Sequence, residues 1–124
     1  MAKRILIVED EPNIVISLEF LMKREGFDVD VASDGETALK VAAATVPDLV
    51  LLDIMLPKMN GFEVCEKLRA DPRWRGTKIM MVTAKGRETD IAKGLALGAD
   101  LYVTKPFSTK DLVAQVKQLL GPGP

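Results

Sequence analysis

Residues 47–61 read Pro-Asp-Leu-Val-Leu-Leu-Asp-Ile-Met-Leu-Pro-Lys-Met-Asn-Gly. Four consecutive apolar residues, Leu49 to Leu52, end on Asp53, and the chain then meets Pro57 and the pair Asn60-Gly61. A short apolar run between a proline and a Pro/Asn/Gly cluster is typical of a buried central strand. Such a strand places Asp53 at its carboxyl end, the edge where ligands bind in open parallel sheets. Taken alone, an aspartate at that place fits a turn or a helix cap equally well.

The segments on either side alternate between strand and helix patterns. Arg4–Val8 and Lys78–Thr83 are two further buried-strand runs, whereas residues 27–32 alternate apolar and polar side chains, as an edge strand does. A short last strand is predicted over 100–104. Helices are predicted from Pro12 to Glu25, from Gly35 to just before Pro47, from about Gly61 to Asp71, from about Arg87 to Leu97, and after Ser108.

This alternation predicts an α/β fold of five βα units. Strands that alternate with helices form a parallel sheet covered on both faces, with right-handed crossovers. The three apolar runs belong in the middle, so the expected architecture is the flavodoxin-like, doubly wound (βα)5 fold with a five-stranded parallel sheet of order 2-1-3-4-5. Residues 1–120 form one domain, and residues 121–124 form a tail or the start of a linker. The helix from about Arg87 to Leu97 contains Gly94 and is expected to be the softest.

Composition excludes several classes of function. Histidine is absent from the 124 residues, which excludes histidine catalysis, histidine metal ligands and phosphohistidine in this chain. Net charge is −1, so there is no general electrostatic case for binding nucleic acid. No apolar run approaches the ~20 residues of a membrane span. The single cysteine, Cys65, is expected to pack in the core and fits a reducing, cytoplasmic compartment.

The expected sheet gathers reactive side chains at one edge. They are Glu9, Asp10 and Glu11 after the first strand, Asp53 after the third, Thr83 after the fourth and Lys105 after the fifth. Carboxylates crowded together repel one another unless a cation intervenes, and an all-oxygen donor set without histidine favours Mg²⁺. An aspartate can act as the nucleophile in phosphoryl transfer, and a lysine and a hydroxyl can meet the phosphoryl oxygens. The edge is therefore predicted to hold one phosphoryl group on a carboxylate.

With these motifs in this order, the chain resembles the receiver domain of two-component response regulators from Lys3 to about Leu120. The motifs that carry the resemblance are Ile-Val-Glu9-Asp10-Glu11, Leu-Leu-Asp53-Ile-Met-Leu-Pro57 with Gly61, Val-Thr83-Ala84, Gly98-Ala99-Asp100 and Lys105-Pro106-Phe107. The resemblance implies that Asp53 accepts a phosphoryl group from a histidine kinase or a histidine phosphotransfer protein. It also implies a cis peptide bond before Pro106.

The resemblance further assigns a metal site. Mg²⁺, with Mn²⁺ as an alternative ion, is expected on Asp10, Asp53 and the backbone carbonyl of Met55, with Glu9 acting through water. Met55, two residues after Asp53, and Lys85, two residues after Thr83, are expected to tune the lifetime of the phosphoryl group.

The same resemblance implies a switch. Thr83 and Lys105 are expected to hold phosphoryl oxygens, and Tyr102 to rotate inward as the signal. The responding face is then the helix after Thr83, the strand over 100–104 and the last helix, which would contact a downstream protein or effector domain, or a second copy on activation. The chain itself is expected to bind neither nucleic acid nor membrane. Its output is open: either it acts alone by docking partners, or it is the excised N-terminal half of a DNA-binding transcriptional regulator.

Three other functions compete with this interpretation. A phosphatase of the haloacid-dehalogenase group also uses an aspartate nucleophile, but it needs a second aspartate two residues later, where this chain has Met55. A flavodoxin-type cofactor carrier is disfavoured because Glu9, Asp10 and Glu11 would repel a phosphate. A dinucleotide carrier of the same cofactor-binding class is also disfavoured, because the Gly-x-Gly-x-x-Gly motif is missing. A degenerate receiver that only binds partners is disfavoured because every expected site residue is present. The chain is thus expected to be a phosphoacceptor signalling domain and not an enzyme for small substrates.

Overall fold

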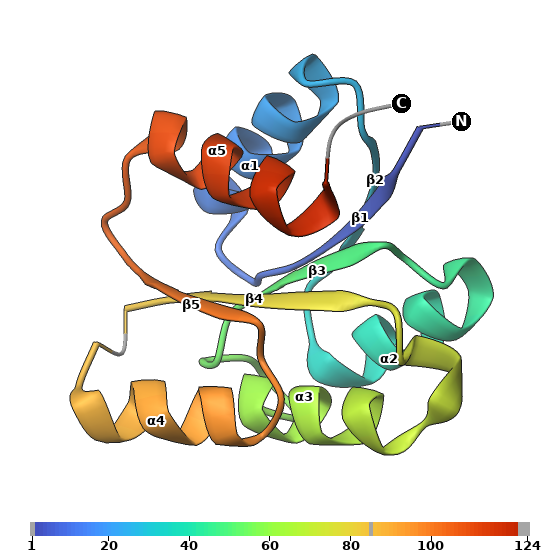
Figure 1. Ribbon diagram of the computed structural model, residues 1–124, viewed down its shortest axis with the longest axis vertical. Coiled ribbons are helices and arrows are strands. Elements are labelled where there is room, and N and C mark those ends of the chain that lie inside the picture. Colours follow the sequence, from blue (N-terminus) through green and yellow to red (C-terminus); the bar gives the residue numbers. More distant parts are fainter. Residues whose placement is uncertain (1, 85, 122–124) are drawn as a thin grey trace.

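The computed structural model describes residues 2–84 and 86–121, which form a single parallel sheet covered by helices (Figure 1). The strands are β1 Arg4–Val8, β2 Asp28–Ala32, β3 Leu49–Leu52, β4 Lys78–Thr83 and β5 Leu101–Thr104. The helices are α1 Pro12–Arg24, α2 Gly35–Thr45, α3 Gly61–Ala70, α4 Glu88–Ala96 and α5 Thr109–Leu120, with a short 3₁₀ turn, η1, at Pro72–Trp74. The strand order is β2-β1-β3-β4-β5, so the predicted fold is confirmed.

The burial of each strand follows its position in the sheet. All four residues of β3 are buried, as are the last five of β4, because helices cover both faces of the central strands. At the edge, β2 keeps its aspartates toward solvent, where Asp30 accepts a hydrogen bond from Arg4 at 2.8 Å and Asp28 lies 3.8 Å from the same guanidinium. The alternation over residues 27–32 therefore marked an edge strand correctly.

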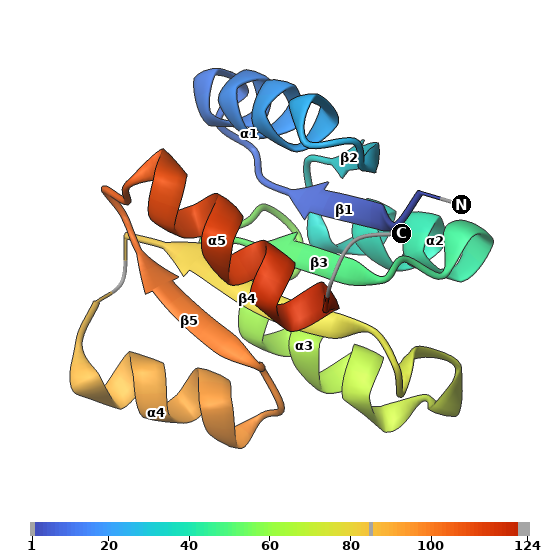
Figure 2. The same cartoon turned by 45° about the horizontal axis from the view of Figure 1, so that its top comes forward.

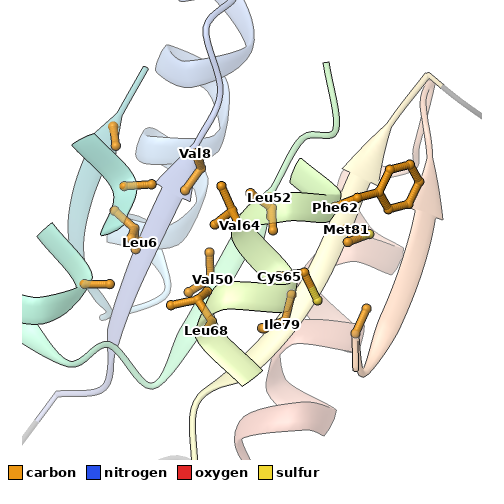
Figure 3. Packing of buried hydrophobic residues seen from close by; sticks show 14 of the residues in the cluster. Leu6, Val8, Val50, Leu52, Phe62, Val64, Cys65, Leu68, Ile79 and Met81 are labelled. Carbon is orange, nitrogen blue, oxygen red and sulfur yellow. The ribbon is translucent and has the colours of Figure 1, made fainter. Parts of the chain in front are cut away.

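Two apolar cores lie on opposite faces of the sheet, and Figure 2 shows α1 and α5 on one side with α2, α3 and α4 on the other. The core under α1 and α5 is formed by Ile5, Ile7, Leu18, Leu21, Met22, Leu49, Leu51, Met80, Val82, Leu112 and Val116. The opposite core contains Cys65, which is fully buried among Val50, Leu68 and Ile79 in Figure 3. Burial of side chains from every strand fixes the sheet register that places the loops at its carboxyl edge.

The predicted helix starts at Gly35, at Gly61 and after Ser108 are confirmed, and one turn was missed. The side chains of Asp34, Asn60 and Ser108 accept hydrogen bonds from the backbone N–H groups of Thr37, Glu63 and Asp111. After α3 the chain does not enter an open loop but forms η1, which buries Trp74 so that its indole N–H donates to the carbonyl of Ala42 in α2 at 3.1 Å. Within the described ranges, no helix combines the length and apolar character needed to cross a membrane.

Candidate phosphoacceptor site

The carboxyl ends of β1 and β3 bring three carboxylates together. Because Val8 of β1 pairs with Leu52 of β3, the next residues, Glu9 and Asp53, leave the sheet at the same level. One carboxylate oxygen from each of Glu9, Asp10 and Asp53 lies within 4.8 Å of the others. The expected acidic cluster is therefore present, with Asp10 exposed and the other two buried.

Glu9 is buried, with its side chain only 3% exposed, and both of its carboxylate oxygens accept hydrogen bonds. Its Oε2 accepts hydrogen bonds from the backbone N–H of Asp10 at 3.1 Å and of Glu11 at 3.3 Å. Its Oε1 accepts from Nζ of Lys105 at 2.6 Å. Burial raises the pKa of Glu9, and the neighbouring charge of Asp53 adds to this, while Lys105 opposes it.

Among the described residues, Lys105 is the only lysine whose ammonium lies between the two buried carboxylates, Glu9 and Asp53. Its Nζ also lies 3.1 Å from Oδ2 of Asp53, and its backbone N–H donates to the carbonyl of Thr83 at 2.8 Å. Burial works against the charge on Lys105, but the hydrogen bond to Glu9 and the charge of Asp53 outweigh it and raise the pKa of the ammonium. The peptide bond to Pro106 is cis, as expected.

Thr83 and Tyr102 lie on the neighbouring strands β4 and β5. Thr83 is fully buried and pairs in register with Thr104, one residue before Lys105. Tyr102 is half-buried, and burial together with the charges of Asp90 and Asp53 raises the pKa of its phenol. Its ring lies against α4 at Gly94, where a Cβ would come within 3.0 Å of the ring edge. Gly94 therefore allows α4 to approach β5 closely, whereas the expected softness of this helix stays a prediction.

The loop after β3 is folded tightly against its own start. The carbonyl of Ile54 accepts hydrogen bonds from the N–H groups of Leu56 at 3.0 Å and Gly61 at 2.9 Å. The N–H of Met55 donates to Oδ1 of Asp53 at 3.2 Å, while the Met55 side chain is 59% exposed at the mouth of the site. Lys85, the second position expected to tune phosphoryl lifetime, lies outside the described residues.

An open groove beside the cluster adds residues that the sequence argument did not single out for the site. Asn60 and Phe62 line it together with Asp10, Ile54, Met55, Leu56 and Pro57. Phe62 also faces the ammonium of Lys93 on α4, which lies 4.5 Å from the ring centroid. The sequence offered one signal that Phe62 lies near the site, because it directly follows Asn60-Gly61 at the predicted helix start.

Comparison with known proteins agrees with this geometry. The family model described as "Response regulator receiver domain" matches residues 5–117. The chain is 51% identical over 120 residues to the alkaline phosphatase synthesis transcriptional regulatory protein PhoP of Bacillus subtilis, covering 97% of this chain and 49% of that protein. It spans about half the length of the curated relatives it matches.

Solved structures agree over nearly the whole chain. A CheY-like response regulator receiver domain protein from Methanospirillum hungatei is 35% identical, with a TM-score of 0.90, covering 97% of this chain and 94% of that one. The receiver domain of the sensor histidine kinase PA1611 from Pseudomonas aeruginosa, solved with a magnesium ion in the active-site cleft, is 28% identical, with a TM-score of 0.89, covering 98% and 99%. On this evidence the chain belongs to the response regulator receiver domain family of two-component systems.

Proposed function

We propose that the chain is a phosphorylatable switch in which Asp53 accepts a phosphoryl group from a phosphohistidine on a histidine kinase or a histidine phosphotransfer protein. The observation that carries the proposal is the position of Asp53. Its carboxylate is buried, clustered with Glu9 and Asp10, and 3.1 Å from the ammonium of Lys105. Nucleophile, acidic cluster and phosphate-binding cation thus come from three separate loops at one sheet edge.

The residues fit a hard divalent cation. Three carboxylates with one ammonium between them leave a net charge of −2, and their donor atoms are all oxygen. Asp10, Asp53 and the carbonyl of Met55 would hold Mg²⁺ directly, with Glu9 acting through water and Mn²⁺ as an alternative ion. When bound, the ion supplies positive charge that neutralises the phosphoryl oxygens and the carboxylates facing them.

The chain's own groups perform the transfer. A carboxylate oxygen of Asp53 attacks phosphorus, the phosphorus–nitrogen bond of the phosphohistidine breaks, and its electron pair returns to the imidazole of the partner. Lys105 turns from Asp53 toward a phosphoryl oxygen, and the hydroxyl of Thr83 donates to another. These two contacts favour the acyl phosphate because they neutralise the negative charge of the phosphoryl oxygens.

The new contacts are strong enough to drive a switch. A phosphoryl group forms about one to three charge-assisted hydrogen bonds. At about 1.5–3 kcal/mol each, two or three of them supply roughly 3–9 kcal/mol, and moving a population from 1:99 to 99:1 needs about 5.5 kcal/mol. We assign the response to α4, β5 and α5, with Tyr102 rotating inward beside Gly94 and with Met55 and Lys85 tuning the lifetime of the signal.

The proposal extends to the output of the domain. Residues 1–120 would act as the receiver unit, and residues 121–124 as a tail or the start of a linker. The matched PhoP is named a transcriptional regulatory protein and is about twice as long. This supports a role as the regulatory half of a DNA-binding regulator, in which α4, β5 and α5 contact the effector domain or a second receiver. A stand-alone receiver that docks a protein partner is the second candidate.

Intact mass spectrometry tests the phosphoacceptor. Incubation with Mg²⁺ and acetyl phosphate should add one phosphoryl group of about 80 Da to the wild type. Asp53→Asn should remove the adduct, and EDTA should prevent it. Asp28→Asn is the matched control, because that carboxylate lies at the amino end of β2, the opposite edge of the parallel sheet, with its side chain 57% exposed, and it should keep the adduct. A folded wild type without an adduct would contradict the proposal.

A further inference from the structure

Two glycines lie directly against the loop that carries Asp53. Gly61 opens α3 and Gly35 opens α2, and both are buried. Each follows a residue whose side chain caps the helix, Asn60 for Gly61 and Asp34 for Gly35. The capped first turn of each helix is therefore held in place where it meets the loop between β3 and α3.

Gly61 contacts the backbone at the phosphoacceptor itself. A Cβ at this position would lie 2.3 Å from the carbonyl oxygen of Asp53 and 2.7 Å from Cα of Ile54. Both are main-chain atoms of a segment tied down by hydrogen bonds, so no side-chain rotation can relieve the overlap. The backbone just before Met55 would have to move away from α3.

Gly35 contacts the other end of the same loop. A Cβ there would lie 2.5 Å from the carbonyl oxygen of Met59 and 2.7 Å from its Cβ. The loop is therefore confined between α2 and α3, and Lys58, one residue before Met59, takes a left-handed conformation with φ of 67°.

Backbone conformation does not explain these two glycines. Neither has a positive φ, whereas Gly26, Gly98 and Gly121 do. Alanine would suit the backbone at both positions and is a far better helix former. What glycine provides here is the absence of a side chain at a point of close backbone approach.

We propose that Gly35 and Gly61 are positioning residues for phosphoryl transfer: their missing side chains set the place of the loop that presents the Asp53 carboxylate and the Met55 carbonyl. The inference rests on the proposed function. Ordinary van der Waals contact begins at 3.4 Å, so a methyl group at Gly61 displaces the loop by about 1 Å, an error that can lower a rate about 100-fold. At Gly35 the displacement reaches Asp53 through five intervening loop residues, so the effect there is smaller.

The test compares Gly61→Ala, Gly35→Ala and Gly76→Ala with the wild type. Gly76 is the matched control, since it is exposed, has no positive φ, and a Cβ there meets nothing within 4 Å. Circular dichroism and urea unfolding report the fold, and the rate of phosphorylation by acetyl phosphate is measured over a range of Mg²⁺ concentrations. Destabilisation alone reduces the folded amount, whereas a displaced carbonyl and carboxylate also raise the Mg²⁺ concentration that gives half the maximal rate.

The expected result is graded. Gly61→Ala lowers the rate at subsaturating Mg²⁺ by 10- to 100-fold and raises the half-saturating concentration, Gly35→Ala does the same by about 3- to 10-fold, and Gly76→Ala matches the wild type. If Gly61→Ala does not fold, Gly35→Ala decides the matter. Folded variants with wild-type rates and Mg²⁺ dependence overturn the inference, as does failure of both variants to fold, which assigns the glycines to stability. A wild type without an adduct contradicts the proposed function instead.

Discussion

Nζ of Lys105 lies 2.6 Å from Oε1 of Glu9, although 96 positions separate the two residues in the chain. The same ammonium lies 3.1 Å from Oδ2 of Asp53. In this structure the cation thus bridges the two buried carboxylates of the cluster. If Asp53 is phosphorylated as proposed, the added negative charge would attract Lys105 away from this position, and the lysine would then couple the phosphorylation state to the loop between β5 and α5.

Lys105→Met should therefore destabilise the protein. It should also raise the affinity for Mg²⁺, because the competing positive charge between the carboxylates is removed. Removing one partner of a buried ion pair costs about 3–5 kcal/mol, so we expect a loss of stability in this range. Urea unfolding with and without Mg²⁺ measures both effects, since the ion should restore part of the loss. Lys110→Met, at an exposed position on α5, is the control. Equal stability and equal Mg²⁺ affinity in Lys105→Met and wild type would refute this account.

Gly94→Ala tests the close approach of α4 to β5. The added methyl group would meet Sδ of Met81 at 2.9 Å and the ring of Tyr102 at 3.0 Å. Overpacking costs about 1–3 kcal/mol and the better helix propensity returns about 1 kcal/mol, so we expect a net loss of about 1 kcal/mol. In a Tyr102→Ala background the overlap with Met81 remains but the overlap with the ring is gone, so the same substitution should cost less. A double-mutant cycle on the free energy of unfolding checks this, and strictly additive effects would mean that the ring and the glycine do not interact.

Arg69→Met tests a polar contact that joins three segments. The guanidinium of Arg69 donates to the carbonyl of Gly98 at 2.9 Å, to the carbonyl of Trp74 at 3.0 Å and to the carboxylate of Asp100 at 2.8 Å. Hydrogen bonds to charged groups contribute about 1.5–3 kcal/mol, so we expect a loss of about 2–3 kcal/mol in urea unfolding.

Arg73→Met is the comparison for Arg69, because Arg73 pairs with Asp71 while its side chain is 55% exposed. Solvent screens an exposed ion pair, and the other contact of Arg73 is its guanidinium stacked 4.4 Å over the Trp74 ring, so this variant should lose less stability than Arg69→Met. Similar losses in the two variants would show that burial of the Arg69 contacts has no energetic consequence.

Cys65 should be inert in the folded protein and should make stability fall at high pH. Burial raises the pKa of its thiol from 9.0 to about 11. The unfolded chain therefore loses this proton near pH 9 while the folded chain keeps it to about pH 11, so the stability present below pH 9 decreases as pH rises through this window, by about 2–3 kcal/mol. The wild type should lose more stability than Cys65→Ala between pH 9 and 11. Ellman's reagent should react quickly only after unfolding, and rapid reaction with the native protein would contradict the burial argument.

Much of the fold was predictable because its signals are local. The apolar runs of β1, β3 and β4 and the alternation over residues 27–32 report how many faces of each strand are covered. Parallel alternation then limits the topology to a few orders, and the carboxyl ends of the central strands collect at one edge. The strand ends alone thus predict that Glu9, Asp10 and Asp53 lie together, as they do in the structure. The 3₁₀ turn at Pro72–Trp74 was missed, because the contact of Trp74 with Ala42 that accompanies it joins residues 32 positions apart.

The amino-acid sequence by itself therefore determined the set of helices and strands, the sheet order and the identity of the reactive side chains. These features depend on the periodicity of apolar residues and on which residues end each strand. Only the tertiary structure decided how those side chains are held: Lys105 between Glu9 and Asp53, Arg69 across three segments, and the loop of Asp53 confined by Gly35 and Gly61. The reason is physical. Such contacts depend on distances of a few tenths of an ångström between segments far apart in the chain, and these distances are set by the packing of the whole core.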